Sequence, residues 1–178
     1  KVGATSRENV AKINVLGTDV KWHFIGHLQT NKVKQAIGTV ELIHSVDSLR
    51  LAREISQWAE RLEIYQPILV QVNLSREESK SGLAPEEVKP VIQEMAGLPG
   101  IAIQGLMTIP PLSSNPEASR GYFRRLRLLA SEISRWGLRG VTMEELSMGM
   151  SDDFEVAIEE GATWVRIGTA IFGPRRDR

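Results

Sequence analysis

The sequence predicts an α/β fold built on a parallel sheet, because short apolar segments alternate with segments whose apolar residues recur at helical spacing. Six strand–helix units follow one another after residue 20. Two strands near the C-terminus stop abruptly in small, hydrogen-bonding residues, within 146–153 (LSMGMSDD) and 164–173 (WVRIGTAIFG). Six units fit either an open doubly wound sheet or an eight-stranded barrel whose first two units are absent from this sequence.

The first half of the chain begins with a segment, 1–20, that shows no clear strand. A helical pattern with Leu49, Ala52 and Ile55 on one side is expected to begin at a cap formed by Asp47 or Ser48. The near-continuous apolar run 67–73 is typical of a strand covered on both faces. The expected elements are strands at 22–26, 41–46 and 67–73, and helices at 27–37 and 49–62.

The second half continues the alternation with clearer boundaries. Pro85 in a first turn and Gly97 after the last turn delimit one helix, and Asn115 and Gly137 delimit the longest one. The expected strands are 101–107, 144–148 and 163–167, and the expected helices are 85–96, 116–136 and 152–160. We expect one domain over 1–178.

Composition narrows the class of protein. The 22 Lys and Arg residues balance the 22 Asp and Glu residues, so the formal net charge is zero, which argues against nucleic acid as the main partner. There is no cysteine, which excludes thiol chemistry and disulfide bonds. No apolar run approaches membrane-spanning length, and the first residues do not follow a signal-peptide pattern. We therefore expect a cytoplasmic protein that binds no membrane.

The two strand ends predict a phosphate site. In parallel barrels, the loops after the last two strands commonly bind phosphate through backbone N–H groups, and Ser or Thr adds a hydroxyl donor. Two ordinary strand-to-helix turns are the alternative, and Ser147 could equally pack inside the barrel. We expect Asp152 and Asp153 to cap the following helix and to point outward. The candidate residues for the phosphate are Ser147, Met150, Ser151, Gly168 and Thr169.

The same motifs carry a resemblance to a known family. The segments at 146–153 and 165–173, together with WHFIGHLQTNK (22–32), HSVDS (44–48), VNLSREESKSGL (72–83) and GLMTIPP (105–111), resemble the pyridoxal-phosphate homeostasis (YggS-type) family in the same order. This resemblance implies a single (β/α)8 TIM-type barrel similar to the N-terminal domain of alanine racemase. It favours the barrel over the open sheet, with the first one or two βα units absent or incomplete in this sequence.

The resemblance also implies the cofactor and its contacts. Pyridoxal 5'-phosphate (PLP) would be held as a lysine aldimine, with Arg166 facing the pyridine nitrogen. A guanidinium stays protonated and can only donate, so it would keep that nitrogen unprotonated and the ring a poor electron sink. The family's lysine strand is not intact here, which leaves Lys1 as a weak candidate for the aldimine. Asn9, within Arg7–Val10, faintly matches a second family motif.

The remaining polar residues predict no catalytic centre of their own. His23 and His44 fit structural histidines within strands, whereas His27 follows a strand and could lie at the barrel mouth. No cluster has metal-ligand spacing, and no serine has the setting of a nucleophile elbow. We expect neither a metal site nor a Ser-His-Asp triad.

Two function classes follow. The resemblance favours a non-catalytic PLP binder in vitamin B6 and amino-acid homeostasis, a monomer that buffers the cofactor or delivers it to apo-enzymes. A PLP-dependent amino-acid racemase is the alternative. It needs acid/base groups on both faces of the substrate, whereas Tyr65 is expected below the sheet and Tyr122 on a helix. A sugar-phosphate barrel enzyme is a third, weaker hypothesis.

Overall fold

The strands form one parallel sheet whose order follows the sequence. The computed structural model describes residues 21–77 and 79–173. Within these ranges the six-stranded sheet has the order β1-β2-β3-β4-β5-β6, and every pairing is parallel. The strands are β1 (His23–Phe24), β2 (Leu42–Val46), β3 (Gln66–Gln71), β4 (Ile101–Met107), β5 (Val141–Met150) and β6 (Trp164–Arg166). A doubly wound sheet reverses its order at a switch point, and this sheet does not, which confirms the barrel-type prediction.

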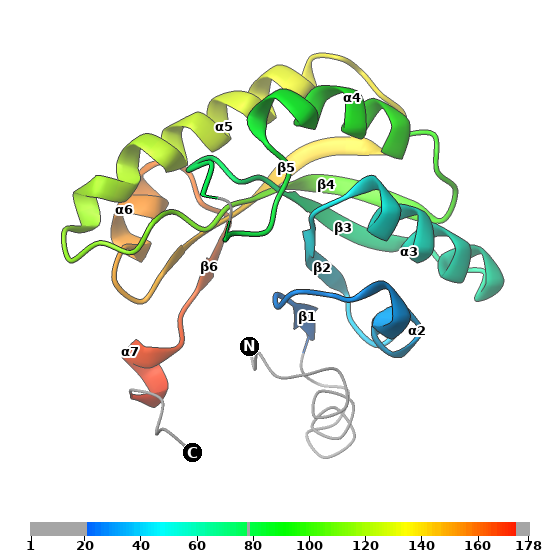
Figure 1. The fold of residues 1–178 in the computed structure, drawn as a ribbon, viewed down its shortest axis with the longest axis horizontal. Helices are drawn as coiled ribbons and strands as arrows, with labels where there is room; N and C mark the ends of the chain where they lie inside the picture. Colours follow the sequence, from blue (N-terminus) through cyan, green and yellow to red (C-terminus); the bar gives the residue numbers. More distant parts are fainter. Residues whose placement is uncertain (1–20, 78, 174–178) are drawn as a thin grey trace.

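The helices that connect these strands cover the convex side of the curled sheet (Figure 1). They are α3 (Leu49–Arg61), α4 (Pro85–Met95), α5 (Arg120–Ser134) and α6 (Phe154–Glu159), with the short α2 (Val33–Ala36) and the 3-10 turns η1 (Thr30–Lys32) and η2 (Pro116–Ser119). A further short helix, α7 (Thr169–Phe172), follows β6. Two of the predicted caps are in place, since Ser48 accepts from the Leu51 N–H and Asn115 accepts from the Glu117 N–H. No helix in the described part of the chain is both long and apolar enough to cross a membrane.

Two hydrophobic clusters lie on opposite sides of the sheet. The large cluster joins the strands to the helices, with fully buried residues such as Ile68 and Phe123. The small cluster consists of Leu42, Leu69 and Met107, with Ile109 and Trp164 packed against it. Because alternate residues of a strand face opposite sides, the small cluster marks the concave face. The fold is therefore part of a barrel with a lined interior.

The curl brings the two edge strands of the sheet close together. The ring of Trp164 on β6 lies 4.5 Å, centroid to centroid, from the ring of His23 on β1. In Figure 1 both strands bend away from the convex helices toward the same side of the molecule. Side chains of the first and last described strands therefore meet inside the curl.

Two elements differ from the sequence prediction. The expected helix over 27–37 begins only at Thr30, because the Ser45 hydroxyl donates to the Gly26 carbonyl at 2.6 Å and ties the segment after β1 to β2. Buried Leu28 also packs into the large cluster, which keeps this segment extended. Strand β5 begins at Val141 rather than at 144, because its polar residues alternate with buried ones and hide the strand from an apolar count.

Candidate functional site

The two polar strand ends lie side by side at the carboxyl edge of the sheet. Met150 at the end of β5 is paired with Arg166 at the end of β6, so the loops that follow are neighbours. The Ser151 hydroxyl oxygen accepts hydrogen bonds from the N–H groups of Gly168 and Ala170, each at 3.2 Å. These backbone donors converge on a single oxygen, as they would on an oxygen of a bound anion.

Gly149 lets strand β5 end directly against α6. Its φ of +88° lies in the left-handed region, and a Cβ there would lie 2.5 Å from the Ala157 Cβ. Asp153 then accepts a hydrogen bond from the Met150 N–H at 2.7 Å and makes no capping bond to α6. Asp153 is therefore the N-cap residue of α6, as predicted, but its carboxylate turns back onto the loop and does not bond to the helix. Met150 contributes its backbone N–H to this turn.

Arg166 lies in the interior of the fold. Only 8% of it is exposed, and it donates from Nη1 to the Ser147 hydroxyl at 2.8 Å and from Nη2 to the Thr108 carbonyl at 2.9 Å. Burial lowers the pKa of Arg166 to about 10, against the opposing effect of the Asp153 carboxylate, so the guanidinium is a cation at neutral pH. Because Thr108 directly follows β4, this cation lies at the carboxyl end of the sheet.

Ser147 is fully buried within the sheet. Its hydroxyl contacts the His44 Nδ1 at 2.8 Å, in addition to Arg166 Nη1. The structure therefore joins Ser147 to the arginine and not to the amides around Ser151. Of the two interpretations that the sequence allowed, packing inside the barrel describes its position.

Two functional contacts were missed by the sequence analysis. His44 and His23 fit structural histidines by pattern, but His23 Nδ1 lies 2.9 Å from His44 Nε2, and the pair leads to Ser147. No pattern in the sequence singles out Thr108, whose carbonyl holds Arg166. Position within a strand could have placed both histidines on the inside. Residues two apart in a strand share a face, and His44 shares its face with Leu42, which belongs to the concave cluster.

The other predicted contacts fall into two groups. Thr169 is exposed, and its hydroxyl makes no hydrogen bond within the described ranges, while a Cβ on Gly168 would meet no protein atom within 4 Å. Both residues are therefore free to approach a ligand beside Ser151. Lys1 and Asn9 lie outside the described residues, so their assignments stay predictions, as does the single-domain boundary of 1–178.

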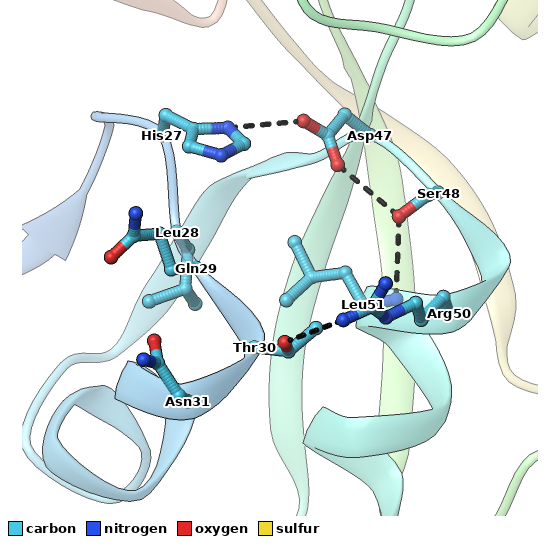
Figure 2. A pocket seen from close by; sticks show the side chains of 9 residues that line it. All are labelled: His27, Leu28, Gln29, Thr30, Asn31, Asp47, Ser48, Arg50 and Leu51. Atoms are coloured by element: carbon cyan, nitrogen blue, oxygen red, sulfur yellow. Dashed lines mark hydrogen bonds and ion pairs between the residues drawn. The ribbon is translucent and has the colours of Figure 1, made fainter.

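A polar cavity of about 500 Å³ lies apart from these candidates, at the carboxyl ends of β1 and β2 (Figure 2). His27 lies there, 3.3 Å from the Asp47 carboxylate, and Arg50 donates to the Thr30 hydroxyl at 3.3 Å. The structure thus places His27 near a strand end, as predicted, but not among the cofactor candidates. The residues that line the cavity are His27, Leu28, Gln29, Thr30, Asn31, Asp47, Ser48, Arg50 and Leu51.

Comparison with known proteins places this geometry in a family. The family model for the N-terminal domain of alanine racemase matches residues 2–176. The pyridoxal phosphate homeostasis protein of Aquifex aeolicus is 53% identical over 89% of this chain and 68% of its own length. The chain belongs to the pyridoxal phosphate homeostasis family. The protein of that name from Synechocystis is 40% identical over 95% of this chain and 78% of its own length.

Solved structures agree with the fold. PipY of Synechococcus elongatus, in a structure with PLP bound, has a TM-score of 0.86 and 35% identity over 94% of this chain and 78% of its own. An alanine racemase from Clostridium difficile, with a TM-score of 0.76 over 99% of this chain and 46% of its own, is 18% identical and shows the fold alone. The chain spans about two thirds of the length of the first homeostasis relatives, 68% and 65%.

Proposed function

We propose that this protein binds PLP between the loops after β5 and β6 and acts as a carrier or buffer of the cofactor. The observation that carries the proposal is the buried, cationic Arg166, which is held by Ser147 and Thr108 beside the amides that converge on Ser151. The homeostasis relatives and the PLP-bound PipY support it. Delivery to apo-enzymes, a monomeric state and a cytoplasmic location belong to the same proposal.

The described residues fit the two ends of this cofactor. The phosphate suits the N–H groups of Gly168 and Ala170, with hydroxyl donors from Ser151 and Thr169 and room beside Gly168. The pyridine nitrogen suits Arg166, since the two internal bonds use two of the five guanidinium N–H groups and leave others for a ligand. Lys1, the candidate for the lysine that would bind the aldehyde, lies outside the described residues.

Arg166 sets the chemistry that the bound cofactor would supply. A bound PLP ring withdraws electrons strongly only when its nitrogen is protonated. Arg166 remains protonated with a pKa near 10, so at neutral pH it donates a hydrogen bond and accepts no proton. The arginine would therefore orient the ring and disfavour carbanion chemistry, as suits a protein that stores a reactive cofactor.

The positions of the tyrosines support a role without catalysis. Tyr65 directly precedes β3, at the amino edge of the sheet, and is 81% exposed. Tyr122 on α5 packs against the convex cluster. Neither lies with the strand ends after β5 and β6, where a racemase needs a second acid/base group.

A spectroscopic titration with PLP tests the binding site. Arg166→Ala should weaken PLP affinity by about tenfold or more, because a charge-assisted bond to the ring is lost. Thr169→Val should weaken it by about 1–3 kcal/mol if its hydroxyl donates to the phosphate. Arg124→Ala, on the convex side, is the matched control and should bind as the wild type does. Wild-type affinity in Arg166→Ala and Thr169→Val would overturn the site.

Deuterium exchange at the α-carbon separates the carrier from an enzyme. PLP-loaded protein incubated with alanine and other amino acids in deuterated water should incorporate no α-deuterium beyond the free-cofactor background. Exchange at enzyme-like rates that Arg166→Ala abolishes would establish the racemase alternative instead.

A further inference from the structure

A chain of polar contacts crosses the concave side of the sheet and ends at Arg166. From Arg166 Nη1 it passes through the Ser147 hydroxyl (2.8 Å) to His44 Nδ1 (2.8 Å). From His44 Nε2 it continues to His23 Nδ1 (2.9 Å), and His23 Nε2 lies 3.8 Å from the Glu41 carboxylate. The members come from β6, β5, β2 and β1 and from the residue before β2. This chain of contacts therefore connects elements that are far apart in the sequence.

The chemistry of the end groups gives this chain a direction. A guanidinium can only donate, so the Ser147 oxygen accepts from Arg166, and its own proton is available for His44 Nδ1. This order assigns the proton of His44 to Nε2, from which it would donate to His23 Nδ1. The proton of His23 is left on Nε2, facing the Glu41 carboxylate. The reverse order would turn an unprotonated His23 nitrogen toward a carboxylate, which is unfavourable.

We propose that His44 is a positioning residue: it fixes the Ser147 hydroxyl and, through it, aims the Arg166 guanidinium at the pyridine nitrogen. The inference rests on the proposed function. An arginine side chain loses rotamer entropy when it is immobilised. The chain of contacts holds Arg166 before any ligand arrives, so that part of this cost is absent from the binding step.

Two substitutions of His44 separate positioning from simple loss of a buried ring. His44→Asn keeps an amide near the position of Nδ1, within reach of Ser147, whereas His44→Gln keeps one near Nε2, within reach of His23. Each variant preserves one of these two contacts of His44 and loses the other. His44→Gln should weaken PLP affinity about tenfold and His44→Asn should restore most of it, because only the contact with Ser147 leads to Arg166. Equal affinities for the two variants would overturn the proposal.

Nitrogen-15 NMR of the PLP-free protein, wild type and variants, tests the same inference without the cofactor. His44 should show an unprotonated Nδ1 and a protonated Nε2, and the two Nη signals of Arg166 should be resolved by slow rotation. His44→Gln should merge the Arg166 signals and His44→Asn should not. A His44 protonated at Nδ1, or Arg166 signals that merge in the wild type, would overturn the positioning role.

The two measurements also distinguish the two proposals. If wild-type protein shows the expected NMR signals but binds no PLP, the proposed function fails and the His44–Ser147–Arg166 arrangement stands. If PLP binds and Arg166→Ala weakens it, while His44→Gln neither moves the Arg166 signals nor changes affinity, the positioning inference alone fails. In the background of Arg166→Ala, His44→Gln should have no further effect on affinity.

Discussion

Arginine is used in two different ways on the two sides of this sheet. On the concave side, Arg166 is buried against neutral acceptors, the Ser147 hydroxyl and the Thr108 carbonyl. On the convex side, the buried carboxylate of Glu160 accepts from Arg120, Arg124 and Arg127 at 3.0–3.4 Å, which ties α5 to the end of α6. We call this second group the Glu160 cluster.

The electrostatic consequences of the two arrangements are opposite. Hydrogen bonds from Arg124 first, then from Arg127 and Arg120, lower the pKa of Glu160 to about 2, so its charge is matched by its neighbours. No described carboxylate forms an ion pair with Arg166, and burial lowers its pKa. The Glu160 cluster is saturated and holds two helices together, while Arg166 retains a charge that a ligand can meet. The comparison separates a contact for stability from a contact for binding.

The largest expected effect on stability comes from Ser147→Val. The substitution leaves a buried guanidinium and the His44 ring without their shared hydroxyl and should lower the free energy of unfolding by about 3 kcal/mol. Urea unfolding measures this loss, with Ser134→Ala on the exposed side of α5 as the control. If the free energy of unfolding fell by less than about 1 kcal/mol, the interior contacts of Ser147 would stabilise the fold no more than surface contacts do.

Glu160→Gln should cost less than Ser147→Val and should depend on pH in a defined direction. Since the pKa of Glu160 is lowered in the fold, the unfolded chain binds more protons, and the stabilisation is complete above the ordinary carboxyl pKa near 4.5. It should be lost as pH falls toward 2. The free energy of unfolding of wild type and Glu160→Gln should be measured from pH 6 to pH 2. The difference between them should shrink as pH falls from about 4.5 to 2. Glu132→Gln on α5 is the control, and a gap constant with pH would contradict the prediction.

Added salt should change the stability differences of these two variants unequally, by less than the substitutions themselves change stability. In about 1 M NaCl the screening length falls to roughly 3 Å, which weakens ion pairs whose cations are partly exposed, such as those of Arg124 and Arg127 with Glu160, more than contacts inside the fold. The stability difference between wild type and Glu160→Gln should therefore narrow, while that for Ser147→Val should persist. If salt reduced the stability differences for Glu160→Gln and Ser147→Val to the same extent, the two regions would not differ in their sensitivity to screening.

Arg124→Ala should have the smallest effect. Arg124 is about half exposed, and Arg120 and Arg127 continue to donate to Glu160 in its absence. We expect a loss of about 0.5 kcal/mol or less in the same urea experiment. A loss larger than that of Glu160→Gln would show that Arg124 acts through contacts outside the Glu160 cluster.

Much of the fold was predictable because its determinants are local. Strand β4 has the expected bounds, Ile101–Met107, and the α4 helix begins at Pro85 as its turn chemistry requires. The segment after β1 was not predictable in this way, since a tertiary bond from Ser45 to Gly26 delays its helix. The choice between barrel and open sheet depends on strand order, which the alternation of elements alone does not determine.

The candidate site was predictable only in part for the same reason. Small residues after β5 and β6 indicated the amides near Ser151 and Gly168, which the structure brings together. The contact between Ser147 and His44 joins residues 103 positions apart, and no local pattern encodes such a pair. The turn of Asp153 toward Met150 is likewise a competition between two nearby N–H partners that capping statistics do not decide.

The contact between His23 and Trp164 has a consequence for how the chain folds. The two rings belong to opposite edges of the sheet and meet at 4.5 Å only after the strands between them have paired in sequence. Because closing so long a loop is entropically costly until those strands are in place, this contact should form late on the folding pathway. In a variant that keeps Trp164 as its single tryptophan, with Trp22, Trp58 and Trp136 replaced by Phe, stopped-flow emission would then time the closure of the interior.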